Sequence, residues 1–127
     1  MAQPTLLSIA KADVITASKN IDSSNKFIKH QSAYMVQQSV EKTLKYLISL
    51  HNNGVFPWGH DIKKLVIEAQ SYEIYVPDII REKADVITSW EAVARYYPTK
   101  IIRRDSIQRI LDEVIKWHRY LNSQGIR

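Results

Sequence analysis

The sequence contains no cysteine, only three glycines and four prolines in 127 residues, and no long apolar run. The absence of cysteine excludes disulfide bonds and thiolate chemistry, and it fits a reducing compartment. No segment approaches the roughly twenty apolar residues of a membrane-spanning helix. The first residues also lack the basic and apolar regions of a secretory signal. We therefore expect a cytoplasmic protein.

The low glycine and proline contents, with 45% hydrophobic residues, argue against disorder and favour a mostly helical chain. A chain of this length can bury a core without covalent staples, and no repeat, low-complexity tract or linker divides it. We expect one domain over residues 1–127. Eighteen Lys and Arg against thirteen Asp and Glu give a net charge of +5, which is compatible with polyanionic partners such as RNA, DNA or nucleotides.

Apolar residues recur along most of the chain at the spacing that buries one face of a helix. The predicted helices cover about residues 4–19 and 26–52, a short segment after Asp61, residues 78–97, and a final segment that Asp105 or Ser106 caps. Residues 72–76 have a strand-like composition, but the chain offers no second strand to pair with them, so we expect a connector. Short loops between long amphipathic helices predict an all-α, antiparallel up-and-down bundle of four to five helices.

The longest predicted helix carries a dense polar band at its centre, formed by Gln37, Gln38, Glu41 and Lys42. Gln38 and Lys42, like Glu41 and Lys45, lie one turn apart and can pair. We interpret the band first as a solvated face opposite the apolar stripe. The alternative is a surface whose hydrogen bonds are satisfied by a second chain.

Several common sites are absent from the sequence. No Asp or Glu stands three residues before any of the four histidines, so the Glu-x-x-His pair of di-iron bundles is missing. Scattered histidines without cysteine do not make a regular structural zinc site, and no phosphate loop or dinucleotide fingerprint occurs. We therefore expect no metal and no cofactor.

The segment Gly59-His60-Asp61 places an imidazole and a carboxylate at a predicted helix N-terminus. Backbone N–H groups at such a position can hold an anion. The simpler interpretation is that Asp61 caps the helix and His60 lies in the loop.

A second candidate is a set of cations around the turn that follows the fourth predicted helix, beside two adjacent tyrosines. Mixed basic and aromatic side chains suit phosphate contact and base stacking. The alternative is a helix C-terminus whose cations complement the helix dipole. The cations are Arg95, Lys100, Arg103 and Arg104.

His118 lies on the apolar face of the final predicted helix, between Val114 and Leu121. We expect a packed, hydrogen-bonded core histidine there rather than a ligand-binding group.

Four segments follow one another along the chain: Ala12-Asp13-Val14 with Ala17, residues 37–45, residues 59–62 and residues 94–98. In this order they resemble the HEPN family, the higher eukaryotes and prokaryotes nucleotide-binding domains. The last segment is similar to the family's Arg-Tyr-Pro signature, with one extra tyrosine. The chain resembles in particular the small prokaryotic type associated with minimal nucleotidyltransferases.

The resemblance implies a HEPN-like helical bundle that pairs as a homodimer and belongs to a toxin–antitoxin pair with a minimal nucleotidyltransferase partner. It also implies nucleotide or RNA binding. In this sequence the dimer-interface candidates are Gln38, Glu41 and Lys42, and the candidates for a nucleotide- or phosphate-binding site are His60, Asp61, Arg95, Lys100, Arg103 and Arg104.

Many HEPN toxins are ribonucleases that use an Arg followed, after four to six residues, by a His. No Arg stands at that spacing before any histidine of this chain. One alternative is a rearranged, metal-independent ribonuclease with His60 as the base and Arg95 stabilising the phosphorane. Another is a purely structural dimerisation module. The segment His118-Arg119-Tyr120 resembles a nucleotidylated motif of some family toxins, but without the upstream Arg we interpret it as coincidence.

Overall fold

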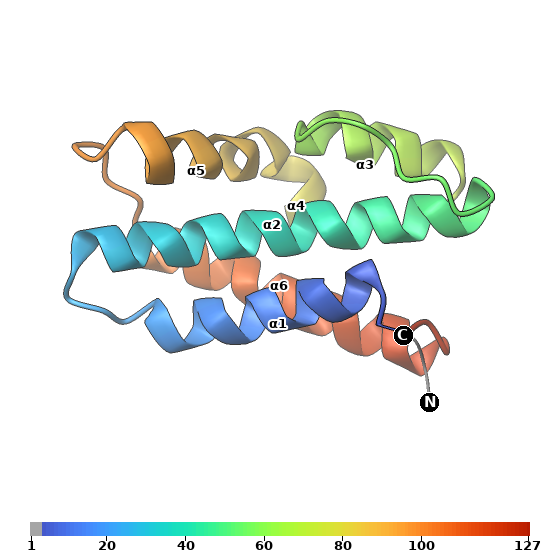
Figure 1. The fold of residues 1–127 in the computed structure, drawn as a ribbon, viewed down its shortest axis with the longest axis horizontal. Coiled ribbons are helices and arrows are strands. Elements are labelled where there is room, and N and C mark those ends of the chain that lie inside the picture. The colour runs from blue at the N-terminus through green and yellow to red at the C-terminus, as the bar shows by residue number, and fades with distance from the viewer. Residues whose placement is uncertain (1–3) are drawn as a thin grey trace.

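The computed structural model describes residues 4–127, which form six α-helices and contain no strand (Figure 1). The predicted all-α class is thereby confirmed, and residues 72–76 form a connector outside the helices, as expected. The helices are α1 (Leu6–Asn20), α2 (Lys26–His51), α3 (Ile62–Ser71), α4 (Asp78–Glu82), α5 (Ala84–Tyr96) and α6 (Arg104–Ser123).

Helix α2 is the axis of the bundle. It runs along the longest dimension of the molecule, with α5 and α3 following one another along one side and α1 along the opposite side (Figure 1). It packs against α1, α3, α5 and α6. None of the helices in residues 4–127 combines the length and apolar composition required to cross a membrane.

The helix ends follow the local sequence. Thr5 and Ser8 form a capping box at the start of α1, and the Asn25 side chain accepts hydrogen bonds from the first backbone N–H groups of α2. Gly54 adopts a φ of 79° after α2, and its N–H donates to the carbonyl oxygen of Ser49 at 2.8 Å. Glycine suits this left-handed conformation because it has no Cβ.

Small residues form the seam between α1 and α2. Ala10 and Ala17 are fully buried, so the two backbones can approach closely. The Ser39 hydroxyl donates to the carbonyl oxygen of Ala10 at 2.8 Å, and the Ser32 hydroxyl donates to that of Ala17 at 3.2 Å. These bonds satisfy buried hydroxyl groups and fix the register of the two helices.

The single helix predicted over residues 78–97 is wrong, because the chain forms two helices there. Lys83 separates α4 from α5 with φ −100° and ψ 13°, outside the regular helical range. The break lets Ile80 of α4 and Ile87 of α5 both become fully buried while α4 packs against α6 and α5 packs against α2. Apolar spacing alone did not reveal it, because one irregular residue hardly shifts the helical phase.

The predicted cap of the last helix is also wrong. Helix α6 begins at Arg104, and Arg103 precedes it without a side-chain hydrogen bond to the helix. Asp105 and Ser106 therefore lie in the first turn of α6. There the negative charge of Asp105 still interacts favourably with the positive end of the helix dipole.

Candidate functional site

Glu41 is the centre of a buried polar network in the middle of α2. Only 5% of the residue is exposed. Its Oε1 accepts a hydrogen bond from Gln37 Nε2 at 3.1 Å and lies 3.0 Å from His60 Nδ1, and its Oε2 forms an ion pair with Lys45 Nζ at 3.3 Å. The expected solvated face is therefore wrong for Gln37 and Glu41, since this chain buries both and supplies their partners.

The other members of the polar band point toward different neighbours. Gln38 donates to Gln37 Oε1 at 2.8 Å rather than pairing with Lys42. Lys42 instead forms an ion pair with Asp13 of α1, with 2.6 Å between Nζ and Oδ2. Gln38 and Lys42 are half-buried, so each keeps an exposed edge.

His60 reaches the network from the loop before α3. Gly59, with a φ of 94°, turns the chain into this position, and Asp61 then caps α3 by accepting a hydrogen bond from the Lys64 N–H at 3.2 Å. The interpretation of Asp61 as a helix cap is thereby confirmed. The side chain of His60 is 67% exposed, so one imidazole nitrogen faces Glu41 while the ring remains open to solvent.

Glu91 of α5 connects the His60 corner to the Arg95 corner. One ligand atom from each of Glu41, His60 and Glu91 lies within 4.8 Å of the others. Arg95 Nη1 lies 3.7 Å from Glu91 Oε1, and Arg95 Nη2 donates to the Tyr34 hydroxyl at 3.0 Å. The guanidinium also stacks over the Tyr34 ring, 5.3 Å from its centroid. The two corners named from the sequence are thus neighbours, with an acidic residue between them.

The loop before α3 and the middle of α2 enclose a pocket of about 460 Å³. Lys42 and Lys45 line it from α2, and His60 lines it from the loop. Phe56 and Trp58 form its aromatic rim, and Trp58 is 97% exposed. A tryptophan that is almost fully exposed is unusual on a protein surface and marks a candidate contact position.

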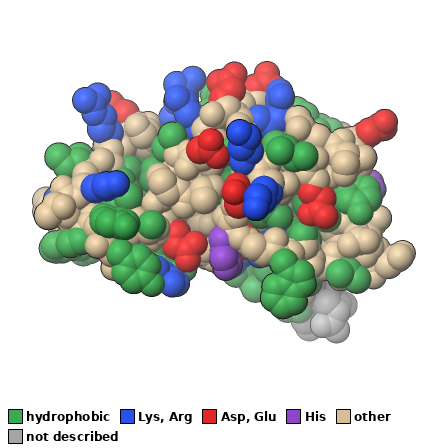
Figure 2. Space-filling model, turned by 90° about the horizontal axis from the view of Figure 1, so that it is seen from above, with side chains coloured by type: hydrophobic (Ala, Val, Ile, Leu, Met, Phe, Trp, Pro, Cys, Tyr) green, Lys and Arg blue, Asp and Glu red, His purple; other side chains and the backbone are tan. Residues whose placement is uncertain are grey.

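Charges on the outer face of α3 and α5 are mixed. Acidic and basic side chains alternate there with hydrophobic ones, and a histidine opens to the surface among them (Figure 2). Among the described residues, this face shows no broad patch of one sign and therefore offers no extended charged surface to a polyanion.

The remaining cations of the predicted phosphate site lie elsewhere. The connection between α5 and α6 is at one end of the bundle, whereas α3 begins near its middle (Figure 1). Lys100 stacks over the Tyr97 ring, 5.0 Å from its centroid, and Arg104 forms an ion pair with Asp22 at 2.5 Å. Arg103 precedes α6. The structure therefore separates these three cations from the pocket at His60.

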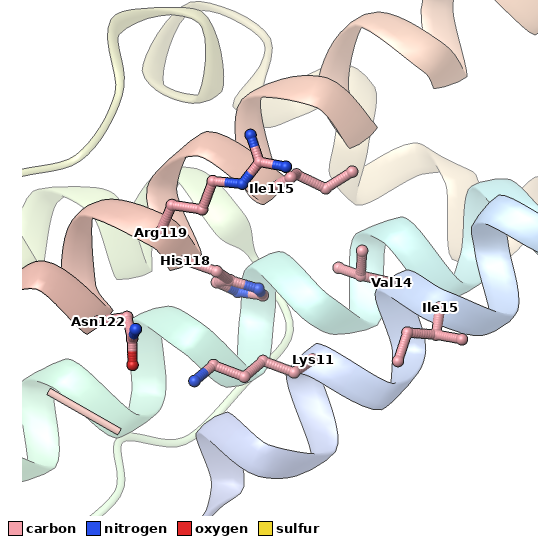
Figure 3. Close-up of a pocket in the computed structure, with 7 residues that line it drawn as sticks. All are labelled: Lys11, Val14, Ile15, Ile115, His118, Arg119 and Asn122. Atoms are coloured by element: carbon pink, nitrogen blue, oxygen red, sulfur yellow. The ribbon is translucent and has the colours of Figure 1, made fainter.

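His118 is a buried histidine, as expected, and is only 7% exposed. Its Nε2 lies 2.9 Å from Thr43 Oγ1. Burial, together with the positive charge of Lys11, lowers the pKa of His118 to about 4, so the ring is neutral at pH 7. It also lines a shallow cavity of about 300 Å³ between α1 and α6, with Lys11, Arg119 and Asn122 around it (Figure 3).

Four residues of the candidate site were not predicted from the sequence. Glu91 was missed because it joins His60 and Glu41 only through the fold, and no local spacing connects the three positions. Lys45 was named only as a helix pair for Glu41, and Phe56 and Trp58 were not singled out as contact positions. The available signal for this rim was the aromatic pair Phe56 and Trp58 in a loop that also contains proline and glycine.

The family model of the HEPN domain matches residues 4–123 of the chain. Comparisons with curated proteins and with solved structures gave no match.

Proposed function

The chain belongs to the HEPN family, and from this premise we propose that it binds a nucleotide or single-stranded RNA in the pocket beneath Trp58. Membership indicates a nucleotide- or RNA-related function in general terms. The observation that carries the specific proposal is the position of the bare Trp58 ring beside a pocket lined by Lys45 and His60.

The aromatic rim supplies the surface for a base. Trp58 is almost fully exposed and Phe56 is about half exposed, so a planar base can stack without displacing packed side chains. Stacking of one base on an aromatic side chain contributes about 1–3 kcal/mol and accepts any base. The rim therefore favours binding with little sequence preference.

The wall of the pocket supplies the contacts for a phosphate. Lys45 and Lys42 bring two ammonium groups from α2, each already held by one carboxylate. His60 is held at Nδ1 by Glu41, which leaves Nε2 available to the pocket. Partly compensated cations favour weak, salt-sensitive phosphate binding. Lys100, Arg103 and Arg104 would then contact the distal part of a longer RNA.

The experiment is a fluorescence-anisotropy titration of a labelled short oligouridylate at low salt, with ATP as the competitor. We expect binding by the native protein and at least about a tenfold loss in Trp58→Ala, consistent with one stacked base. Tyr75→Ala is the matched control, because Tyr75 is an exposed aromatic residue that lines a different pocket. Absence of binding, or equal affinity for the native protein and Trp58→Ala, would reject the proposal.

We further propose that the protein is a homodimer partnered with a minimal nucleotidyltransferase in a toxin–antitoxin pair. The support is the family resemblance and the half-buried edges of Gln38 and Lys42. Glu41, the third interface candidate, offers little surface to a second chain because its own chain covers it. Sedimentation equilibrium tests the dimer: Gln38→Glu should lower the mass toward that of a monomer if these edges meet across a two-fold axis.

The alternative of a metal-independent ribonuclease at His60 and Arg95 has weaker support. Glu91 lies between the two residues and already pairs with Arg95, so its negative charge opposes a phosphate at that point. Degradation of RNA in the presence of a chelator, and its loss in Arg95→Ala, would favour this alternative. A protein that binds no nucleotide but still dimerises would favour the structural module.

A further inference from the structure

We propose that Glu41, His60 and Glu91 form a binding site for a divalent transition-metal ion. Their three ligand atoms lie within 4.8 Å of one another, although the residues come from α2, the loop before α3 and α5. The pair Glu41 Oε1 and His60 Nδ1 is separated by 3.0 Å. Two ligand atoms that each lie about 2.0–2.2 Å from a shared ion are separated by a distance close to the 3.0 Å between Glu41 Oε1 and His60 Nδ1. Small side-chain movements would therefore let these residues share one ion.

The ligand set defines the class of ion. One imidazole nitrogen and two carboxylate oxygens suit Zn²⁺, Co²⁺ or Mn²⁺, whereas Mg²⁺ and Ca²⁺ prefer shells made of oxygen only. Three protein ligands also leave a position for water or for an external ligand, as in catalytic rather than structural metal sites. This geometry differs from the Glu-x-x-His arrangement of di-iron bundles, which the sequence lacks.

The carboxylates of the site are oriented by neighbouring donors. Gln37, which is fully buried, donates to Glu41 Oε1, and Lys45 holds Glu41 Oε2. On the other side Arg95 contacts Glu91 and is itself fixed by Tyr34. The neutral Gln37 amide holds its carboxylate in place without opposing a cation, and the loss of such a hydrogen bond commonly reduces metal affinity.

Lys45 and Arg95 also place two positive charges beside the site, which opposes a cation. The proposal therefore implies a site of moderate affinity. Replacing Lys45 by the uncharged Met should strengthen metal binding by several-fold. If Glu41, His60 and Glu91 only contact one another and bind no metal ion, Lys45→Met should not strengthen metal binding.

The test uses the full chain, freed of metal with a chelator and titrated with Co²⁺ and Zn²⁺ in the absence of nucleotide. We expect a visible Co²⁺ absorption band with one ion per chain, displacement by Zn²⁺, and little effect of excess Mg²⁺. Glu91→Gln and His60→Asn should each weaken binding at least about tenfold, the usual scale for loss of a metal ligand or its support. His60→Asn is the safer variant for folding, since that side chain is 67% exposed.

The control variant is Glu82→Gln, an exposed acidic residue at the end of α4, which should bind the ions as the native protein does. Circular dichroism of each variant checks that the helices remain. Unchanged binding in both Glu91→Gln and His60→Asn, or absence of a one-to-one Co²⁺ complex in the native protein, would overturn the proposal. The measurement needs no nucleotide, so its failure would leave the proposed nucleotide pocket unaffected.

Discussion

Glu41 Oε1 lies 3.0 Å from His60 Nδ1, and this contact joins the buried middle of α2 to the exposed loop before α3. The two residues differ sharply in environment, since Glu41 is 5% exposed and the His60 side chain is 67% exposed. A buried carboxylate thereby fixes a surface imidazole at the wall of the pocket. The loop that carries Trp58 is attached to the bundle through the same contact.

The first prediction concerns the stability of the network. Glu41→Ala should lower the free energy of unfolding by about 3 kcal/mol, because removal of one partner leaves a buried Gln37 amide and a Lys45 ammonium without a carboxylate. Urea denaturation of the native protein and the variant measures this loss.

The control for that measurement is Glu82→Ala, which removes an exposed carboxylate at the end of α4. It should change the free energy of unfolding by less than about 0.5 kcal/mol, as surface substitutions usually do. Equal stability of Glu41→Ala and Glu82→Ala would show that the network does not stabilise the bundle.

The second prediction concerns Trp58. Of the three tryptophans, Trp90 and Trp117 are 3% and 1% exposed, whereas Trp58 is 97% exposed. Acrylamide should therefore quench the tryptophan fluorescence of the native protein mainly at Trp58. In Trp58→Phe, the remaining fluorescence should lie at shorter wavelength and most of the quenching should be lost. Strong quenching that persists in Trp58→Phe would mean that a second tryptophan is accessible.

The third prediction follows from His118. Its pKa is lowered to about 4 from 6.5 by burial, so between these values the unfolded chain binds more protons than the folded one. The contribution to stability is full above about pH 6.5 and is lost as the pH falls toward 4. For this histidine the free energy of unfolding should fall by about 2 kcal/mol between about pH 7.5 and pH 5.

The matched variant is His118→Gln, whose side chain does not titrate. Burial also lowers the pKa of His30, which contributes acid sensitivity to both proteins, so only the difference between them reports His118. The native protein should lose more stability on acidification than His118→Gln does. Identical pH profiles would contradict a buried, neutral His118.

The fourth prediction concerns the ion pair between Asp13 and Lys42, which joins α1 to α2 at 2.6 Å and is only partly exposed. A double-mutant cycle with Asp13→Ala and Lys42→Ala should give a coupling of about 1 kcal/mol. Additive effects of the two substitutions would show that the pair contributes nothing beyond its separate side chains.

The sequence predicted the fold class because helix signals are local. Asp61 caps α3 as expected, and Asn25 and Gly54 stand at the two ends of α2. The periodic apolar stripe of α2 was also correct, and Val40 and Leu44 are fully buried.

The surroundings of α2 were not predictable from its own pattern. A helix that packs against four others is buried on more than one face, so Gln37, Ser39 and Thr43 are buried although they are polar. Hydroxyl groups tolerate this because they bond within the chain, as Thr43 does to the Ser39 carbonyl oxygen at 2.7 Å. The polar residues alone therefore predicted a solvent-exposed face of α2, whereas the fold buries that face.

The candidate site was predictable only in part, for a related reason. His60 and Arg95 were chosen for their chemistry, and the fold brings them together through Glu91. Arg104 was grouped with them because it is close in sequence, yet its partner is Asp22 in the turn between α1 and α2. Contacts between distant segments decide a composite site, and a single sequence does not display them.

The most direct test of the nucleotide-binding proposal is a two-dimensional ¹H–¹⁵N NMR titration of the native protein with a short oligouridylate. The account predicts shift changes concentrated on Lys45, Gly59, His60 and the indole N–H of Trp58. Changes confined to residues 99–104, or an unchanged spectrum at low salt, would contradict it.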